Sequence, residues 1–102
     1  MNQLNSLILE GTVTKSAVYD DKQALFSISV SRYFKDTNGE LGEIKSYFDV
    51  EVNGVLAEKL YSRLQEGRGV RIVGQLRSKN VGNADKVYVL AEHIELKPKK
   101  EA

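Results

Sequence analysis

The chain has no cysteine and no tryptophan, and it has only one histidine and one proline. Without cysteine it forms no disulfide and no thiolate metal site, and His93 alone cannot hold a structural zinc ion. No apolar run approaches the ~18 residues that cross a membrane, and the start, MNQLNSLILEG, lacks the basic residues of a signal peptide. We therefore predict no metal, no cofactor and no membrane contact, and a reducing compartment, the cytoplasm.

Motifs of catalysis are missing as well. The sequence contains no phosphate-binding glycine loop, no G-x-S-x-G and no H-E-x-x-H. The acidic residues outside the alternating segments, such as Asp20 and Glu43, have no nucleophile near them in the sequence. A net charge of +1 argues neither for nor against a polyanionic partner. The length of 102 residues favours a single domain, and we predict a binding module and not an enzyme.

The centre of the chain predicts a strand, a helix and another strand. Apolar and polar residues alternate over 48–53, as in a strand with one buried face. Leu56, Leu60 and Leu64 then recur every four residues, which is the spacing of one face of a helix. Two glycines end this helix, and the alternation restarts over 70–76.

Three further strands flank this centre, two before it and one after it. Residues 7–13 and 24–31 alternate, and Gly11 marks a bend or bulge in the first. Residues 87–96 alternate with a change of phase that predicts a bulge near Glu92–His93. This element order is that of an all-β, five-stranded Greek-key barrel of the OB type, with one helix between strands three and four. Its predicted interior consists of apolar side chains: Leu7, Leu9, Phe26, Ile28, Val30, Phe48, Val50, Val52, Leu60, Val70, Ile72 and Val89.

The polar segments 15–23, 32–46 and 77–86 are predicted as loops. The middle one is either a tall hairpin arm or a mobile binding element. It opens with residues 32–35 (RYFK), in which cations can meet phosphates while rings stack on bases. By parity Phe34 also continues the inward face of the preceding strand, so both core packing and base stacking remain open for its ring.

Two features concern the ends and the outer surface. Residues 1–96 are assigned to the barrel domain, and the basic segment 97–102 is expected to be a short disordered tail. Ile8 lies on the outer face of the first strand. It is either an isolated exposed aliphatic residue or part of an edge that another subunit covers.

Taken together, these segments resemble the bacterial single-stranded DNA-binding protein (SSB) family over roughly residues 5–96. The opening NSLILEGTVT resembles its glycine-kinked first strand, and ALFSISV resembles its second. Gly54 and the L-A-E of 56–58 are similar to its helix start, and the GQLR of 74–77 resembles its G-x-L-(R/K). The resemblance implies an OB fold, a homotetramer or homodimer, and sequence-tolerant binding of single-stranded DNA without catalysis. It also implies a role in replication, recombination or repair at the nucleoid, and contacts with replication proteins.

The resemblance further implies where the DNA is held. Of four aromatic positions in the family, the first two fall on Phe34 and Tyr47, which keep a ring. The other two fall on Asn53 and Asn80, which cannot stack. The predicted site therefore has two rings and five cations: Phe34, Tyr47, Arg32, Lys35, Lys45, Arg77 and Lys79.

Departures from the family pattern keep a second function open. Asp49 and Glu51 place like charge where phosphates would pass, and each lost stacking partner removes ~1–3 kcal/mol. The sequence ends in KPKKEA and lacks the family's long polar tail with an acidic tip. The first function is a short single-stranded DNA-binding protein. The alternative is a primosome-type OB-fold adaptor that binds DNA weakly and acts mainly through protein contacts.

Overall fold

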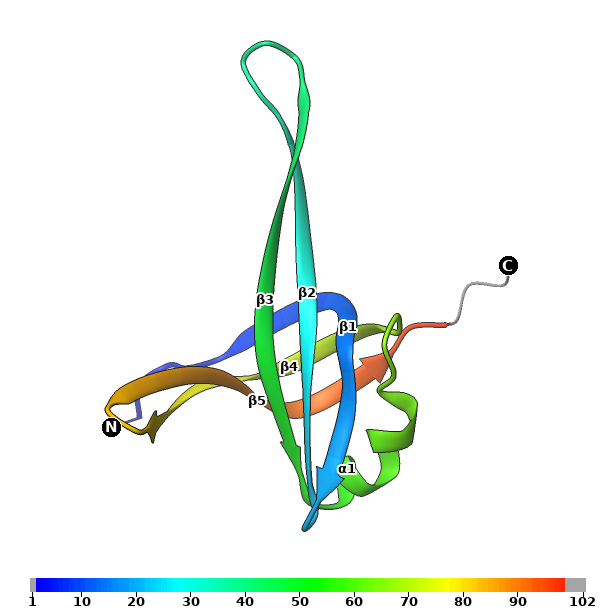
Figure 1. Cartoon of the computed structure of the whole chain (residues 1–102), viewed down its shortest axis with the longest axis vertical. Helices are drawn as coiled ribbons and strands as arrows, with labels where there is room; N and C mark the ends of the chain where they lie inside the picture. The colour runs from blue at the N-terminus through cyan, green and yellow to red at the C-terminus, as the bar shows by residue number, and fades with distance from the viewer. Residues whose placement is uncertain (1, 99–102) are drawn as a thin grey trace.

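The computed structural model describes residues 2–98, which contain five strands, one α-helix and one 3-10 helix (Figure 1). The two helices follow one another between the third and fourth strands. In chain order the elements are β1 (Leu7–Asp20), β2 (Gln23–Lys35), β3 (Leu41–Asn53), α1 (Gly54–Leu60), η1 (Tyr61–Arg63), β4 (Gly69–Val81) and β5 (Ala84–Leu96).

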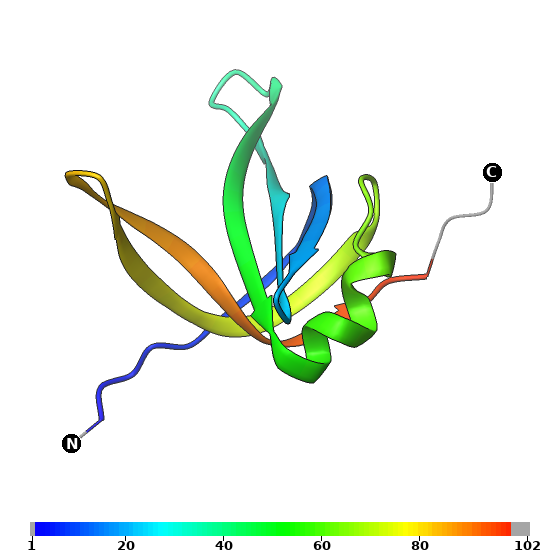
Figure 2. The same cartoon turned by 60° about the horizontal axis from the view of Figure 1, so that its bottom comes forward.

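The strands close into a barrel in the order β1-β2-β3-β5-β4. Neighbouring strands are antiparallel except β3 and β5, which are parallel and pair at Val50↔Val89 and Glu51↔Leu90. A closed five-stranded barrel with its helix between β3 and β4 is the OB fold, so the predicted fold is confirmed. Figure 2 shows α1 crossing one end of the barrel.

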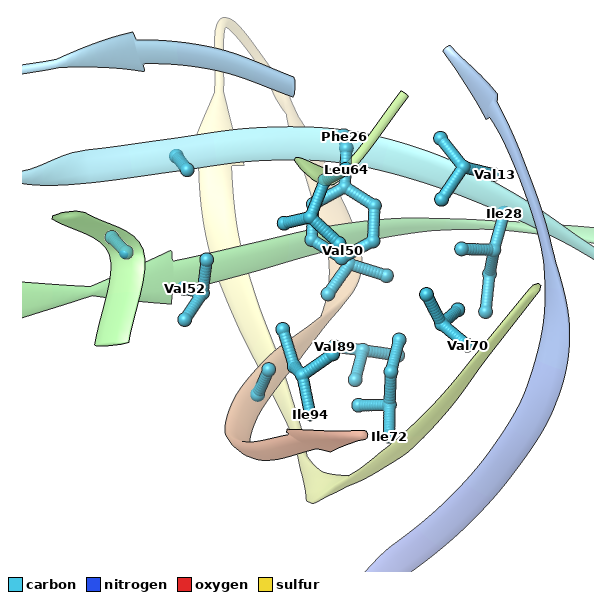
Figure 3. Packing of buried hydrophobic residues seen from close by; sticks show 13 residues of the cluster. Val13, Phe26, Ile28, Val50, Val52, Leu64, Val70, Ile72, Val89 and Ile94 are labelled. Carbon is cyan, nitrogen blue, oxygen red and sulfur yellow. The ribbon is translucent and has the colours of Figure 1, made fainter. Parts of the chain in front are cut away.

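Every buried side chain within residues 2–98 is apolar (Figure 3). Ala57 of α1 and Leu64, just after η1, have no exposed surface and complete this cluster from the helical side. Burial of apolar surface at ~25 cal/mol per Å² is what offsets the entropy lost on folding. Of the predicted interior residues, Phe26, Ile28, Val50, Val52, Val70, Ile72 and Val89 are buried, while Leu7, Leu9, Val30, Phe48 and Leu60 pack against them and are partly buried.

A bulge interrupts β5 at the predicted place. Val73 pairs with His93 and Gly74 pairs with Ala91, so Glu92 is the extra residue. Gly74 lies so close to the backbone of Leu90 that a Cβ atom there would overlap its carbonyl oxygen. The sharp bend of β4 and β5 therefore requires glycine at this position.

The first predicted loop, 15–23, is instead the second half of β1. This strand continues to Asp20 and turns back into β2 at Asp21 and Lys22, which both have positive φ. Two irregularities in the β1–β2 register, between Val13 and Lys15 and between Lys15 and Val18, break the alternation in the sequence. Because the prediction relied on that alternation, it ended the strand too early.

The other two predicted loops are also strands, and they extend the sheet beyond the barrel as hairpin arms (Figure 1). We call residues 30–47 the β2–β3 arm and residues 77–88 the β4–β5 arm. Asp36 holds the turn of the first arm by accepting hydrogen bonds from the N–H groups of Asn38 and Glu40, both at 2.9 Å. Of the two alternatives for 32–46, the tall hairpin arm is the observed one.

Lys97, the first residue of the predicted tail, is attached to the barrel. Its N–H donates to the carbonyl oxygen of Gly69 at 3.0 Å, and its ammonium lies 2.6 Å from the Glu10 carboxylate. This contact lowers the pKa of Glu10. Ordered contacts thus run past residue 96, and the disorder expected for 99–102 lies outside the described residues.

Candidate nucleic-acid interface

A groove of about 270 Å³ crosses the outer surface of β1, β2 and β3, and the β4–β5 arm forms one of its walls. Figure 2 shows this arm and the β2–β3 arm diverging from the barrel. In OB folds this outer face, flanked by the loops after the first and fourth strands, is the usual place for an oligonucleotide. The groove is lined by Lys15, Ser16, Val18, Leu25, Phe26, Ser27, Asp49, Val50, Glu51, Lys79, Lys86, Val87 and Tyr88.

The β4–β5 arm presents three cations and a ring on one face. Arg77 pairs with Tyr88, and Lys79 pairs with Lys86. Residues that pair directly across strands share a face, and pairs two positions apart share it as well. The Lys79 Nζ atom lies 5.0 Å from the centroid of the Tyr88 ring. Lys79 and Lys86 are like charges directly opposite one another, which destabilises a strand pair. A bound anion would relieve this repulsion.

Lys86 and Tyr88 were not among the predicted site residues, although Arg77 and Lys79 were. The signal that identifies them is the Gly82–Asn83 turn. Since Val81 pairs with Ala84 across it, counting outward from this two-residue turn places 79 opposite 86 and 77 opposite 88. Treating 77–86 as a loop hid this pairing.

The outward face of β2 and β3 continues the groove up the β2–β3 arm. Ser27, Ser29 and Ser31 pair with Asp49, Tyr47 and Lys45 in turn, and Tyr33 pairs with Glu43 further out. Tyr47 is 66% exposed and Tyr33 is 73% exposed. A hydrogen bond with Glu43 raises the pKa of the Tyr33 hydroxyl. Tyr33 is therefore a second outward ring that parity with Tyr47 could have identified.

Phe34 lies on the opposite face of this arm. It pairs with Gly42, and Arg32 pairs with Ile44, in alternation with the outward pairs. The ring lies over Gly42, where any side chain would overlap it, and it remains 42% exposed. The predicted inward parity of Phe34 is correct, but the arm extends beyond the barrel at this point, so the ring does not reach the core. The structure thus places Tyr47, Lys45 and Lys35 on one face, Phe34 and Arg32 on the other, and Arg77 and Lys79 on the second arm.

Two carboxylates lie on the floor of the groove. Asp49 accepts a hydrogen bond from the Ser27 hydroxyl at 2.9 Å, and Glu51 accepts one from the Asn53 amide at 3.2 Å. Asn80 similarly donates to Asp85 at 3.2 Å. In the part of the chain that the structure describes, neither floor carboxylate is in an ion pair.

Within residues 2–98, no group of histidine and acidic side chains could hold a metal ion. No helix there is long and apolar enough to cross a membrane.

The sequence model of the single-strand binding protein family matches residues 4–96. The chain therefore belongs to this family. The family resemblance seen in the sequence is confirmed.

Individual relatives agree with this assignment. The chain is 32% identical over 75 residues to a single-stranded DNA-binding protein of Aquifex aeolicus, a match that covers 70% of this chain and 51% of the relative. It is 31% identical over 85 residues to single-stranded DNA-binding protein 2 of Chlorobaculum tepidum, covering 78% and 57%. The chain thus spans little more than half the length of these curated relatives.

Solved structures share the fold. A Plasmodium falciparum SSB in complex with single-stranded DNA has a TM-score of 0.81 at 20% identity, covering 96% of this chain and 98% of that one. The single-stranded DNA binding protein of Thermus aquaticus, as a deletion mutant, has a TM-score of 0.73 at 26% identity, covering 93% and 51%. The first likeness concerns the fold alone.

Proposed function

We propose that the protein binds single-stranded DNA in the groove and along the outward face of the β2–β3 arm. The observation that carries this proposal is one face of the β4–β5 arm. Lys79, Lys86 and Tyr88 on this face line the groove, and Arg77 lies on the same face opposite Tyr88. Membership of the single-strand binding protein family and the names of the relatives support it. The biological setting would be replication, recombination or repair in the cytoplasm, at the nucleoid.

In this binding mode cations hold the phosphates and rings stack on the bases. Stacking tolerates any sequence because every base has a π-face. Tyr88 lines the groove. Tyr47 lies on the outward face of β3 that continues from the groove, and Lys45 and Lys35 lie further along this face. Because Phe34 and Arg32 lie on the reverse of the β2–β3 arm, they contact the same DNA strand only where it wraps around the arm.

The first experiment is a titration of a fluorescent mixed-sequence oligonucleotide at two salt concentrations. We expect saturable binding that weakens with salt, since each neutralised phosphate releases a counterion. Phe34→Ala, Tyr47→Ala and Tyr88→Ala should each weaken binding by ~1–3 kcal/mol, because each removes a stacking partner. Tyr61→Ala, whose ring stacks on Tyr19 outside the groove, is the matched control.

Circular dichroism of each variant separates lost stacking from lost structure. If the wild type shows no saturable binding at low salt, or if all three ring variants bind like the wild type, single-stranded DNA is not the ligand of this surface. The adaptor function then takes its place. It is favoured by apolar side chains exposed on the β2–β3 arm, with Leu41 82% and Ile44 55% exposed, which suit a protein partner such as a component of the replication machinery.

Self-association is proposed along the first half of β1. Residues 7–10 pair with β4 on one side, and pairing with β2 on the other side begins only at Thr12. An unpaired strand edge is a template for another chain. Ile8, which is 61% exposed and opposite Val73, lies beside this edge. A two-fold pairing of β1 with its copy would cover both, giving a dimer or a tetramer.

Light scattering tests this proposal at micromolar concentration. The wild type should have the mass of a dimer or a tetramer, and Ile8→Lys should shift it to the monomer because a buried charge has no partner there. Val55→Lys, at a position on α1 that is 65% exposed, should leave the mass unchanged. A monomeric wild type would contradict the proposal.

A further inference from the structure

Between positions 31 and 47 of the β2–β3 arm, Gly42 is the one residue that is not exposed. Its cover is the ring of Phe34, which lies directly opposite on β2. We propose that Gly42 is a positioning residue for DNA binding, which holds the Phe34 ring flat against the arm so that one ring face is closed and the other receives a single base. This inference rests on the single-stranded DNA binding proposed above. It concerns how one stacking partner is held, and not whether DNA binds.

The backbone of β3 does not require glycine at position 42. Gly39, in the turn of the arm, has a φ of 80°, where glycine is favoured, whereas Gly42 is not among the residues with positive φ. A glycine inside a strand also weakens that strand, because it has no side chain to pack and loses more entropy on folding. Close approach of a neighbouring group is the usual reason for such a glycine, and here the neighbour is an aromatic ring.

The contact geometry shows which part of the ring meets Gly42. A Cβ atom added at Gly42 would overlap Cζ of Phe34 and would lie 2.8 Å from both Cε1 and Cε2. An atom that is nearly as close to both Cε atoms as to Cζ lies over the face of the ring, since beyond the ring edge the Cε atoms would be much farther away than Cζ. The ring therefore lies with its face against the backbone of Gly42. Because carbon atoms pack best at ~3.5–4.0 Å, there is no room for even a methyl group.

The two faces of the Phe34 ring are therefore not equivalent. Gly42 closes one face, so the exposed surface of Phe34 lies on the opposite face and on the ring edge. A ring with one free face can stack on one base, but it cannot insert between two. Arg32 lies two residues along on the same side of β2, so a cation is available for a phosphate beside that base.

Holding the ring before DNA arrives strengthens binding. A side chain with solvent around it samples several rotamers, and fixing it in a complex reduces the affinity. The contact with Gly42 orders the Phe34 ring in the free protein, so this loss is avoided. A methyl group at position 42 would push the ring off the arm, which would restore its freedom and change the face that it presents.

The test is a cycle of four proteins titrated with the fluorescent mixed-sequence oligonucleotide at low salt: the wild type, Gly42→Ala, Phe34→Ala and the double variant. In the wild-type background Gly42→Ala should weaken binding by about threefold to tenfold, because the ring must be ordered again on binding. In the Phe34→Ala background the added methyl group has room, so Gly42→Ala should change the affinity by less than about twofold.

A second measurement follows the ring without DNA. The chain has no tryptophan, so Phe34→Trp introduces a single indole whose fluorescence anisotropy reports its motion. Adding Gly42→Ala should lower this anisotropy, because the indole is no longer held against the strand. Val81→Trp, at a position on the β4–β5 arm that is 48% exposed, is the matched control. Its anisotropy should not respond to Gly42→Ala.

Three results would overturn the inference. Gly42→Ala could bind like the wild type, it could weaken binding equally with and without the Phe34 ring, or it could leave the anisotropy of the indole at position 34 unchanged. Equal weakening in both backgrounds would show that Gly42 acts on the arm itself and not through the ring. If the wild type binds no oligonucleotide, the proposed function fails and the positioning role fails with it, an outcome that the titration of the wild type alone distinguishes from the other three.

Discussion

Val50→Asp is expected to unfold the domain. Val50 is 1% exposed, pairs with Phe26 on one side and Val89 on the other, and belongs to the same buried cluster as Leu64 (Figure 3). All buried neighbours are apolar, so the new carboxylate would have neither a hydrogen-bond donor nor a cation. Burying such a group costs several kcal/mol, which is comparable with the ~5–15 kcal/mol that stabilises an entire small domain.

Thermal denaturation followed by circular dichroism measures this effect. Val55→Asp is the matched control, since it introduces the same side chain at a position in the first turn of α1 that is 65% exposed. A carboxylate near a helix N-terminus is tolerated or mildly favourable. If Val50→Asp melts at the same temperature as the wild type, β3 does not form the core wall described above.

The double variant Lys79→Glu/Lys86→Glu should have the largest effect on DNA binding. It replaces two paired cations beside Tyr88 with two anions, so attraction to phosphate becomes repulsion. We expect affinity at low salt to fall by at least about a hundredfold, because both phosphate contacts and their counterion release are lost and the new carboxylates repel phosphate. Lys79→Ala alone should reduce the slope of log affinity against log salt by about one unit.

Lys59→Glu/Arg63→Glu makes the same change in net charge on α1 and η1, away from the groove. If this control loses as much affinity as the arm variant, attraction is a property of the whole surface and not of the β4–β5 arm. Both double variants lie at exposed positions, so their melting temperatures should stay near that of the wild type.

The barrel was predictable because each of its strands has one buried face. Val50 and Val52 alternate with polar residues, and Leu60 and Leu64 switch to a helical spacing, so the residue pattern reports burial directly. The change of phase at Glu92 even located the bulge. Ala57 has little signal of its own, because a small residue on a helix becomes a core residue only through the packing of its neighbours.

The arms were not predictable by the same argument. Each arm is a two-stranded ribbon with solvent on both faces, so side chains such as Tyr33, Ile44 and Lys86 are exposed on either face. No alternation of apolar and polar residues is required there. The relevant information lies in the turns at Asn38–Gly39 and Gly82–Asn83, which fix the register by counting. Most of the predicted site residues were assigned to loops, so the face on which Phe34 lies could not be predicted before the strand register was known.

Substitutions in the arms and in the barrel core should have different consequences for this protein. Side chains over residues 31–47 are nearly all exposed. Apart from the turn held by Asp36 and the close contact of Gly42 with Phe34, substitution there removes little buried contact and should change the free energy of unfolding by about 0.5 kcal/mol or less. Binding chemistry can therefore diverge in the arms while the barrel stays under constraint from its core. A fold shared at a TM-score of 0.81 with only 20% identity shows how far the sequence can change while such a barrel is kept.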